Sequence, residues 1–165
     1  MDFLAWLEQT GFSRWMRESP SLLAFPAVLV LHTVGMGFLV GTNVAIDLRV
    51  LGFASGIPLA PIKRFFPVMW LGFWVNALSG LALLIAYPTK ALTNWVFYVK
   101  LALIVLAIAG LLLLRNQVFG DPEPDGKPLP RMGRILAGTS LLLWVGAITA
   151  GRLLAYTYVQ LVAGG

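Results

Sequence analysis

Three side chains that could carry chemistry stand inside long apolar stretches of this sequence: His32, Lys100 and Arg152. An ionisable group inside a bilayer costs about 2.5 to 3.5 kcal/mol on insertion scales, so each is a candidate for function. Counted at about 1.5 Å of rise per residue, they lie roughly 9 to 16 Å from the same, outer end of their stretches. No carboxylate accompanies them. Two cations and an imidazole in one half of the membrane favour an anionic ligand or lipid.

These residue types suit a b-type haem, with His32 as axial ligand to the iron and Lys100 and Arg152 facing the propionates. Glycines after His32 would let a flat ligand approach, and the next apolar stretch could form a wall. The sequence therefore predicts a cofactor site made of His32, Lys100, Arg152, Gly35, Trp74 and Asn76, with His32 as the metal ligand. A single histidine leaves the second axial position open, because Met36 stands one turn along the same helix. The sequence predicts no catalytic residue.

Each candidate also has a simpler interpretation. His32 could hydrogen-bond a backbone carbonyl or Asn76, and the two cations could extend along their own helices to the headgroups. His32 and Met36, four residues apart, resemble half of a copper(I) site.

Other features near His32 also have structural interpretations. Gly37 and Gly41 form a small-x-x-x-small pattern that is typical of helix packing. Asp47 and Arg49 are interpreted as a charge pair at a helix end.

The composition excludes several classes of protein. Of the 165 residues, 59% are hydrophobic and 12% are charged, and there is no cysteine. A soluble domain carries about 25% charged residues, so a soluble enzyme, a disordered chain and a disulfide-stapled module are excluded. Without cysteine there is no iron–sulfur cluster and no covalent haem attachment through C-x-x-C-H. The net charge of +5 comes from cations at the ends of apolar runs, which indicates membrane topology and no nucleic-acid partner.

Four apolar segments are long enough to cross a bilayer of about 30 Å. They cover approximately residues 21–46, 65–88, 94–114 and 135–161, so the fold class is an all-α integral membrane four-helix bundle in a single domain, 1–165. Pro26, inside the first segment, should kink its helix. Residues 116–133, rich in proline and glycine, are expected to form a mobile cytoplasmic loop.

The first 18 residues interleave charged and aromatic side chains, which predicts a short amphipathic helix in the headgroup layer. Lysine and arginine bias predicts that the connections after the first and third spans are cytoplasmic and that both termini are outside, periplasmic in a bacterial inner (plasma) membrane. Seven cations lie on the first side: Arg49, Lys63, Arg64, Arg115, Lys127, Arg131 and Arg134. Three lie on the other: Arg14, Arg17 and Lys90.

One motif resembles a known family. Asp47-Leu48-Arg49-Val50-Leu51-Gly52, after a histidine in the first span, is similar to the D-L-R-x-L-G close of an uncharacterised bacterial family of small four-helix membrane proteins. That family also has a proline–tryptophan–glycine stretch and an F-x-x-K, which read here Pro67-Val68-Met69-Trp70-Leu71-Gly72 and Phe97-Tyr98-Val99-Lys100. The resemblance covers about residues 21–116 and implies a fold.

More distantly, His32 and the Lys100-Leu101-Ala102-Leu103 opening of the third span resemble CopD-type copper-resistance domains and the HemJ-type protoporphyrinogen oxidase. In the HemJ type, a histidine and a lysine at comparable places are associated with haem. The resemblance therefore implies that His32 and Lys100 are site residues here.

The sequence thus favours a membrane subunit that binds haem b and exchanges electrons with a quinone or a periplasmic cytochrome. The alternative is a non-enzymatic membrane anchor or a copper-handling protein. Whether the protein is an enzyme stays open. The expected partners are the lipid bilayer, a redox partner and a second copy of the chain in a homo-oligomer.

Overall fold

The computed structural model describes residues 2–53, 55–120 and 129–163, and this part of the chain is helical without any strand. The elements, in chain order, are α1 (Asp2–Glu8), α2 (Gly11–Glu18), α3 (Phe25–Leu51), α4 (Leu59–Ile62), the 3₁₀ turn η1 (Lys63–Phe65), α5 (Phe66–Ala86), α6 (Pro88–Leu92), α7 (Trp95–Phe119) and α8 (Arg131–Ala163). The predicted all-α fold class is confirmed.

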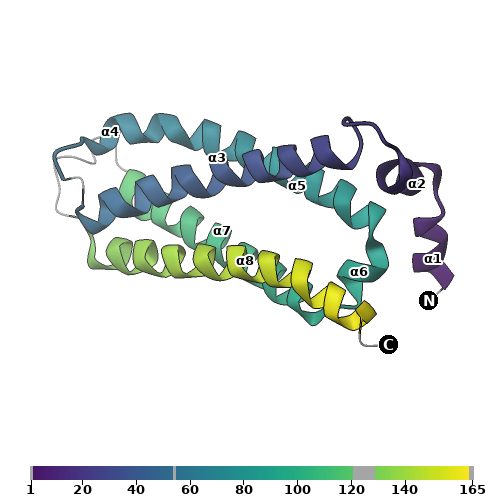
Figure 1. Cartoon of the computed structure of the whole chain (residues 1–165). Coiled ribbons are helices and arrows are strands. Elements are labelled where there is room, and N and C mark those ends of the chain that lie inside the picture. The colour runs from purple at the N-terminus through teal and green to yellow at the C-terminus, as the bar shows by residue number, and fades with distance from the viewer. Residues whose placement is uncertain (1, 54, 121–128, 164–165) are drawn as a thin grey trace.

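Four of these helices are long and apolar enough to cross a membrane: α3, α5 together with its α4 and η1 lead-in, α7 and α8. They form two antiparallel pairs (Figure 1). α3 packs along α5, and α7 packs along α8, while α3 and α8 join the two pairs. In contrast, α5 and α7 make little backbone contact with each other. The bundle is therefore closed along one seam and loosely packed along the opposite one.

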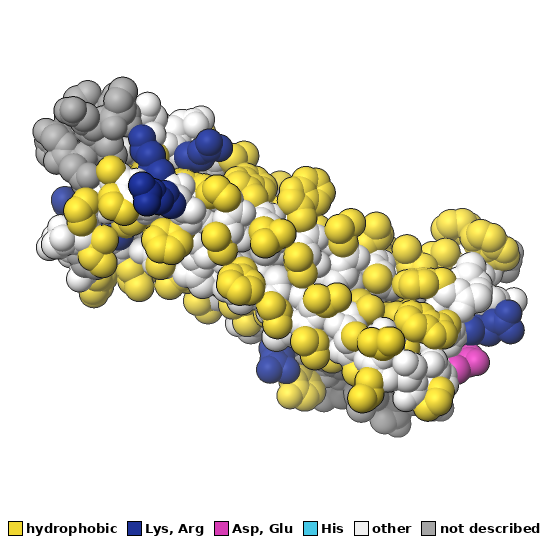
Figure 2. Space-filling view, turned by 90° about the horizontal axis from the view of Figure 1, so that it is seen from above, with side chains coloured by type: hydrophobic (Ala, Val, Ile, Leu, Met, Phe, Trp, Pro, Cys, Tyr) yellow, Lys and Arg dark blue, Asp and Glu magenta, His cyan; other side chains and the backbone are white. Residues whose placement is uncertain are grey.

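The outside of the bundle is apolar. Large hydrophobic side chains such as Leu71, Leu142 and Val145 are more than 60% exposed. Figure 2 shows hydrophobic side chains along the visible face, with most lysine and arginine side chains towards its ends. A soluble bundle would bury such side chains, so this surface is suited to lipid.

Proline residues and one capping side chain explain where three of the long helices begin. Pro26 and Pro67 stand in the first turns of α3 and α5, where the missing N–H has no intrahelical acceptor to lose. The prediction that Pro26 kinks a helix from within is therefore wrong, because the helix begins at Phe25. Asn94 caps α7 by accepting a hydrogen bond from the backbone N–H of Val96 at 3.0 Å.

The predicted segment boundaries need three changes. The first span starts later and continues through Asp47 and Arg49 to Leu51, so the D-L-R-x-L-G motif is helical up to its glycine. Gly52 ends it with a φ of +101°, the left-handed conformation that favours glycine. The loop predicted for residues 116–133 is also shorter than expected, because residues 116–119 belong to α7 and residues 131–133 belong to α8. The centre of that loop, 121–128, lies outside the described residues.

The N-terminal segment forms two short helices, not one. α1 and α2 lie across one end of the bundle, near α6 and the C-terminal end of α8 (Figure 1). Ser13 donates a hydrogen bond to the carbonyl oxygen of Ile85 at 2.7 Å, and the Arg17 guanidinium lies 3.8 Å from the Glu8 carboxylate. Exposed Trp6 and Trp15 point away from the buried side, as interfacial anchors would.

The two ends of the bundle differ in charge. The described parts of the connections after the first and third spans, whose sequence holds most of the cations, lie at the end that carries α4, whereas both termini lie at the other end (Figure 1). The termini are therefore on the same side, as predicted. Which face of the membrane each end occupies stays a prediction.

α3 and α5 meet at a pair of glycines. A Cβ added to Gly35 would lie 2.6 Å from the backbone nitrogen of Asn76, and one added to Gly72 would lie 2.7 Å from the backbone nitrogen of Leu39. Contacts this short leave no room for a side chain, so the backbones touch directly. The sequence assigned helix packing to Gly37 and Gly41, but neither would meet an atom within 4 Å. That prediction is wrong, and the packing positions are Gly35 and Gly72.

Candidate functional site

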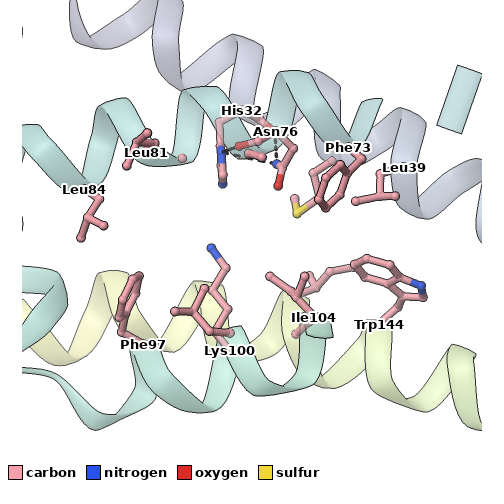
Figure 3. A pocket seen from close by; sticks show the side chains of 16 residues that line it. His32, Leu39, Phe73, Asn76, Leu81, Leu84, Phe97, Lys100, Ile104 and Trp144 are labelled. Atoms are coloured by element: carbon pink, nitrogen blue, oxygen red, sulfur yellow. Dashed lines mark hydrogen bonds between the residues drawn. The ribbon is translucent and has the colours of Figure 1, made fainter. Parts of the chain in front are cut away.

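A cavity of about 310 Å³ lies between all four long helices, in the half of the bundle nearer α6. Figure 3 shows its walls, α3 and α5 on one side and α7 and α8 on the other. Its polar members are His32, Asn76 and Lys100. The remaining lining residues are apolar or small: Met36, Leu39, Phe73, Ala77, Gly80, Leu81, Leu84, Phe97, Leu101, Ile104, Trp144, Ala147 and Ile148.

The imidazole of His32 is held by one nitrogen and open at the other. Nδ1 lies 3.0 Å from the backbone oxygen of Asn76 and 3.2 Å from Oγ of Ser79. Because a carbonyl oxygen only accepts, Nδ1 carries the proton in this bond. In the neutral ring, Nε2 then offers a lone pair, and it points into the cavity without a partner among the described residues (Figure 3). This arrangement is typical of a histidine that ligates a metal.

α5 is shaped to receive this ring. A Cβ added to Gly80 would lie 3.0 Å from Cε1 and 3.4 Å from Nδ1 of His32. The Asn76 side chain donates from Nδ2 to the backbone oxygen of His32 at 2.7 Å. The simpler interpretation of the sequence, that His32 hydrogen-bonds a backbone carbonyl or Asn76, is thus confirmed. These hydrogen bonds leave Nε2 of His32 available.

Lys100 enters the cavity from the opposite wall. It extends from α7 with Nζ directed towards His32 (Figure 3). A Cβ added to Gly151 of α8 would lie 3.7 Å from its Cε, so the stem runs beside a position without a side chain. Among the described residues, no carboxylate pairs with Lys100. The ammonium and the imidazole therefore face each other across apolar walls.

The structure brings together three of the six predicted site residues. His32, Lys100 and Asn76 line the cavity. Gly35 lies at the α3–α5 contact, Trp74 is 58% exposed on the outer face of α5, and Arg152 is exposed on α8 outside the cavity. Helical periodicity explains the outcome, because Trp74 and Asn76 are two residues apart and cannot share a face.

Phe73 lines the cavity, as the sequence suggested, but sequence reasoning missed Trp144 and Phe97 as cavity walls. Each is one of many aromatic residues in apolar runs, and nothing in the local pattern separates a wall from a lipid-facing position. Trp144 is 3% exposed, and its indole nitrogen is directed away from His32 and Lys100 (Figure 3). Met36 also lines the cavity, as the copper alternative requires.

No cluster of three or more histidine, cysteine, aspartate or glutamate side chains exists within residues 2–53, 55–120 and 129–163. A metal held by protein ligands alone would therefore have few of them. A metal held by a porphyrin needs only axial ligands, which His32 can supply.

A second polar cluster lies on α3 and α8, towards the end of α3 that is followed by α4. The Asn43 amide donates to Asp47 Oδ2 at 2.5 Å and to Ser140 Oγ at 2.8 Å, and all three side chains are at most 2% exposed. Within the described part of the chain, three buried polar atoms have no hydrogen-bond partner: Asp47 Oδ1, Asn43 Oδ1 and Trp144 Nε1. The predicted charge pair with Arg49 is wrong, because Asp47 is turned into the bundle and Arg49 donates to the backbone oxygen of Ile57.

We expect Asn43→Ala to destabilise the bundle by about 1 to 3 kcal/mol, because it leaves the Asp47 carboxyl and the Ser140 hydroxyl without their shared partner. Thermal unfolding in detergent, followed by circular dichroism, measures the effect. Asn116→Ala, on an exposed position of α7, is the matched control and should leave the midpoint unchanged. Equal midpoints for the two variants would show that the cluster adds no stability.

Comparisons of the chain with protein families, with curated proteins and with solved structures find no match. The resemblance carried by the D-L-R-x-L-G motif therefore stays a prediction, and function has to be argued from the cavity itself.

Proposed function

We propose that the protein binds b-type haem in the cavity of the four-helix bundle and serves as a membrane-embedded electron-transfer subunit. The observation that carries this proposal is the His32 ring, whose Nδ1 is held by α5 while Nε2 faces an apolar cavity. An axial histidine needs this orientation, and an apolar surrounding is what a porphyrin requires.

In this proposal Lys100 would supply the second nitrogen ligand as the neutral amine, after its ammonium has lost a proton, because an ammonium has no lone pair for a metal. It faces His32 from the opposite wall, where a second axial ligand belongs, and the sequence offered none. We assign it this role in place of the predicted propionate contact. The exposed Arg152 is outside the cavity and takes no part in the proposed site.

The size and the opening of the cavity support a large apolar ligand. Its volume is at the lower end of the range of about 300 to 1,000 Å³ that is typical of ligand sites. Because α5 and α7 are loosely packed, a planar ligand can extend between them towards the lipid. The same opening favours a lipid-soluble quinone as the redox partner, with a periplasmic cytochrome as the other candidate.

An absorption spectrum of the protein, purified from cells supplied with haem precursors, tests the proposal. We expect a Soret band and low-spin α and β bands after reduction, because two nitrogen ligands give a low-spin iron. Lys100→Ala should keep the haem and shift the spectrum to the high-spin form. A preparation without a Soret band after haem reconstitution would refute the proposal.

Copper handling is the second candidate, because Met36 and His32 line the same cavity. A thioether and an imidazole are suitable copper(I) ligands. Copper content after anaerobic loading distinguishes the two. Loss of bound copper in Met36→Ala, together with an absent Soret band, would favour copper. If neither haem nor copper binds and a partner protein co-purifies, the protein is an anchor.

A further inference from the structure

The polar cluster of Asn43, Asp47 and Ser140 contains a carboxyl group that is buried in a membrane-spanning helix. Asp47 stands in α3 and is 1% exposed. The three side chains do not line the cavity that holds His32. Trp144, one turn further along α8 than Ser140, forms part of the wall of that cavity, so the cluster adjoins it. The proposed haem site leaves the buried carboxyl without a role.

Asp47 forms no ion pair with any residue in the described part of the chain. α5, which packs along α3, carries no ionisable side chain from Phe66 to Ala86. The arginines of the long helices at this end are exposed or bonded elsewhere: Arg49 of α3, Arg115 of α7, and Arg131 and Arg134 of α8. An ionised carboxylate in apolar surroundings is costly unless a cation pairs with it. Taking up a proton removes that cost.

The hydrogen bonds of Asp47 also give little support to a negative charge. Within residues 2–53, 55–120 and 129–163, Asp47 Oδ2 accepts one hydrogen bond, from the Asn43 amide, and Oδ1 has no partner. A carboxylate that stays ionised in a protein interior usually accepts several hydrogen bonds, because each of them stabilises the charged form. The surroundings of Asp47 are therefore polar enough to orient the carboxyl group but do not replace the water that an anion needs.

The Asn43 amide can serve the carboxyl group with or without a proton. Its nitrogen lies 2.5 Å from Asp47 Oδ2 and 2.8 Å from Ser140 Oγ, and it donates to both, which suits a carboxylate that only accepts. If the amide turns by half a rotation, its oxygen takes the place of the nitrogen. The oxygen then accepts from a protonated Asp47 and from the Ser140 hydroxyl. A separation of 2.5 Å lies within the usual range of an O–H···O bond.

Asp47 lies close to one end of its helix. Four residues separate it from Leu51, where α3 ends, which is about 6 Å at 1.5 Å per residue. The distance to Phe25, at the start of α3, is about 33 Å on the same basis. Since α4 follows at the nearer end (Figure 1), a proton from water on that side has the shorter distance to cross.

We propose that Asp47 is a proton-binding site of the membrane-spanning bundle, which takes up a proton from water at the end that carries α4. The proton forms an O–H bond on the carboxylate and removes its negative charge, and the Asn43 amide oxygen accepts the new hydrogen bond. Release reverses both changes and returns the proton to the same side. A proton fits this cluster better than a metal ion does, because an ion between these atoms would have to break the bonds at 2.5 and 2.8 Å.

Infrared difference spectroscopy of the full chain tests this proposal. The protein is kept without haem in dodecyl maltoside, a detergent that has no carbonyl group, at about pH 6, where carboxyl groups in water are ionised. We expect the wild type to show the C=O stretching band of a protonated carboxylic acid, which shifts in D₂O because its proton exchanges. Asp47→Asn should lose this band completely. Asn43→Ala should keep the band and move it to higher frequency, because the proton loses its acceptor.

Glu18→Gln is the matched control, because it removes an exposed carboxyl group of α2 and should leave the band unchanged. Absence of the band from the wild type, or its persistence in Asp47→Asn, would overturn the proposal. Disappearance of the band when sodium chloride is added would also overturn it, since Asp47 would then hold a metal cation. Should Asp47→Asn not fold, ¹³C labelling of aspartate in the wild type assigns the same band, and a band that does not shift excludes Asp47.

Discussion

His32→Ala is expected to lower haem occupancy by more than tenfold and to abolish the Soret band of the purified protein. Mutation of a residue that only orients a metal ligand already lowers metal affinity by about 10 to 100-fold. Loss of the ligand itself should therefore lower haem affinity by more than tenfold. No other histidine exists in the sequence to replace it. The ratio of Soret to protein absorbance after reconstitution measures the loss.

Imidazole rescue distinguishes ligation from a structural role of His32. The substitution leaves a space beside Gly80 that free imidazole can fill, so added imidazole should restore the band if the ring is a ligand. Thr33→Ala, at the exposed neighbouring position, is the control and should bind haem normally. An unchanged spectrum in His32→Ala would remove this residue from the site, whatever else the protein binds.

Gly35→Ala should destabilise the bundle strongly, because the added methyl group has no room between α3 and α5. Its Cβ would lie 2.6 Å from the backbone nitrogen of Asn76 and 3.0 Å from the backbone oxygen of Gly72, and a backbone cannot turn aside as a side chain can. Overpacking of this kind costs about 1 to 3 kcal/mol, and here both helices must separate. We expect a clearly lower unfolding midpoint in detergent.

Gly37→Ala is the matched control for this experiment. It lies two residues along the same helix, its Cβ would meet nothing within 4 Å, and alanine favours helix over glycine by about 1 kcal/mol. Its midpoint should equal or exceed that of the wild type. A stable Gly35→Ala protein would mean that α3 and α5 pack less closely than the structure places them.

Much of the fold follows from the sequence, because a bilayer admits few alternatives. Uncharged runs of about 20 residues have to be helices that satisfy their own backbone, so the four spans and the shared side of the termini were predictable. The exact ends of the helices were less predictable. Pro26 suits the first turn of a helix as well as a kink, and only the start of α3 at Phe25 separates the two.

The candidate site was predictable in part for a related reason. His32 and Lys100 are costly in lipid, so they were expected to face inward, and the structure places both in one cavity. Arg152 is as costly, but it stands on a face of α8 that is exposed, from which its long side chain can extend towards the headgroups. Which glycine faces a neighbouring helix depends on helix rotation, which an apolar sequence with little amphipathic pattern does not encode. For that reason Gly35 and Gly72 were not recognised as partners.

The weak contact between α5 and α7 has a consequence for how any ligand of the cavity is handled in the laboratory. A molecule that arrives sideways through this seam comes from the hydrocarbon phase, so its supply depends on its mole fraction among the lipids. Affinities expressed per litre of buffer would then include the partition coefficient of the ligand. Generous washing with detergent would dilute that reservoir and strip the occupant, whereas extraction with little detergent would preserve it.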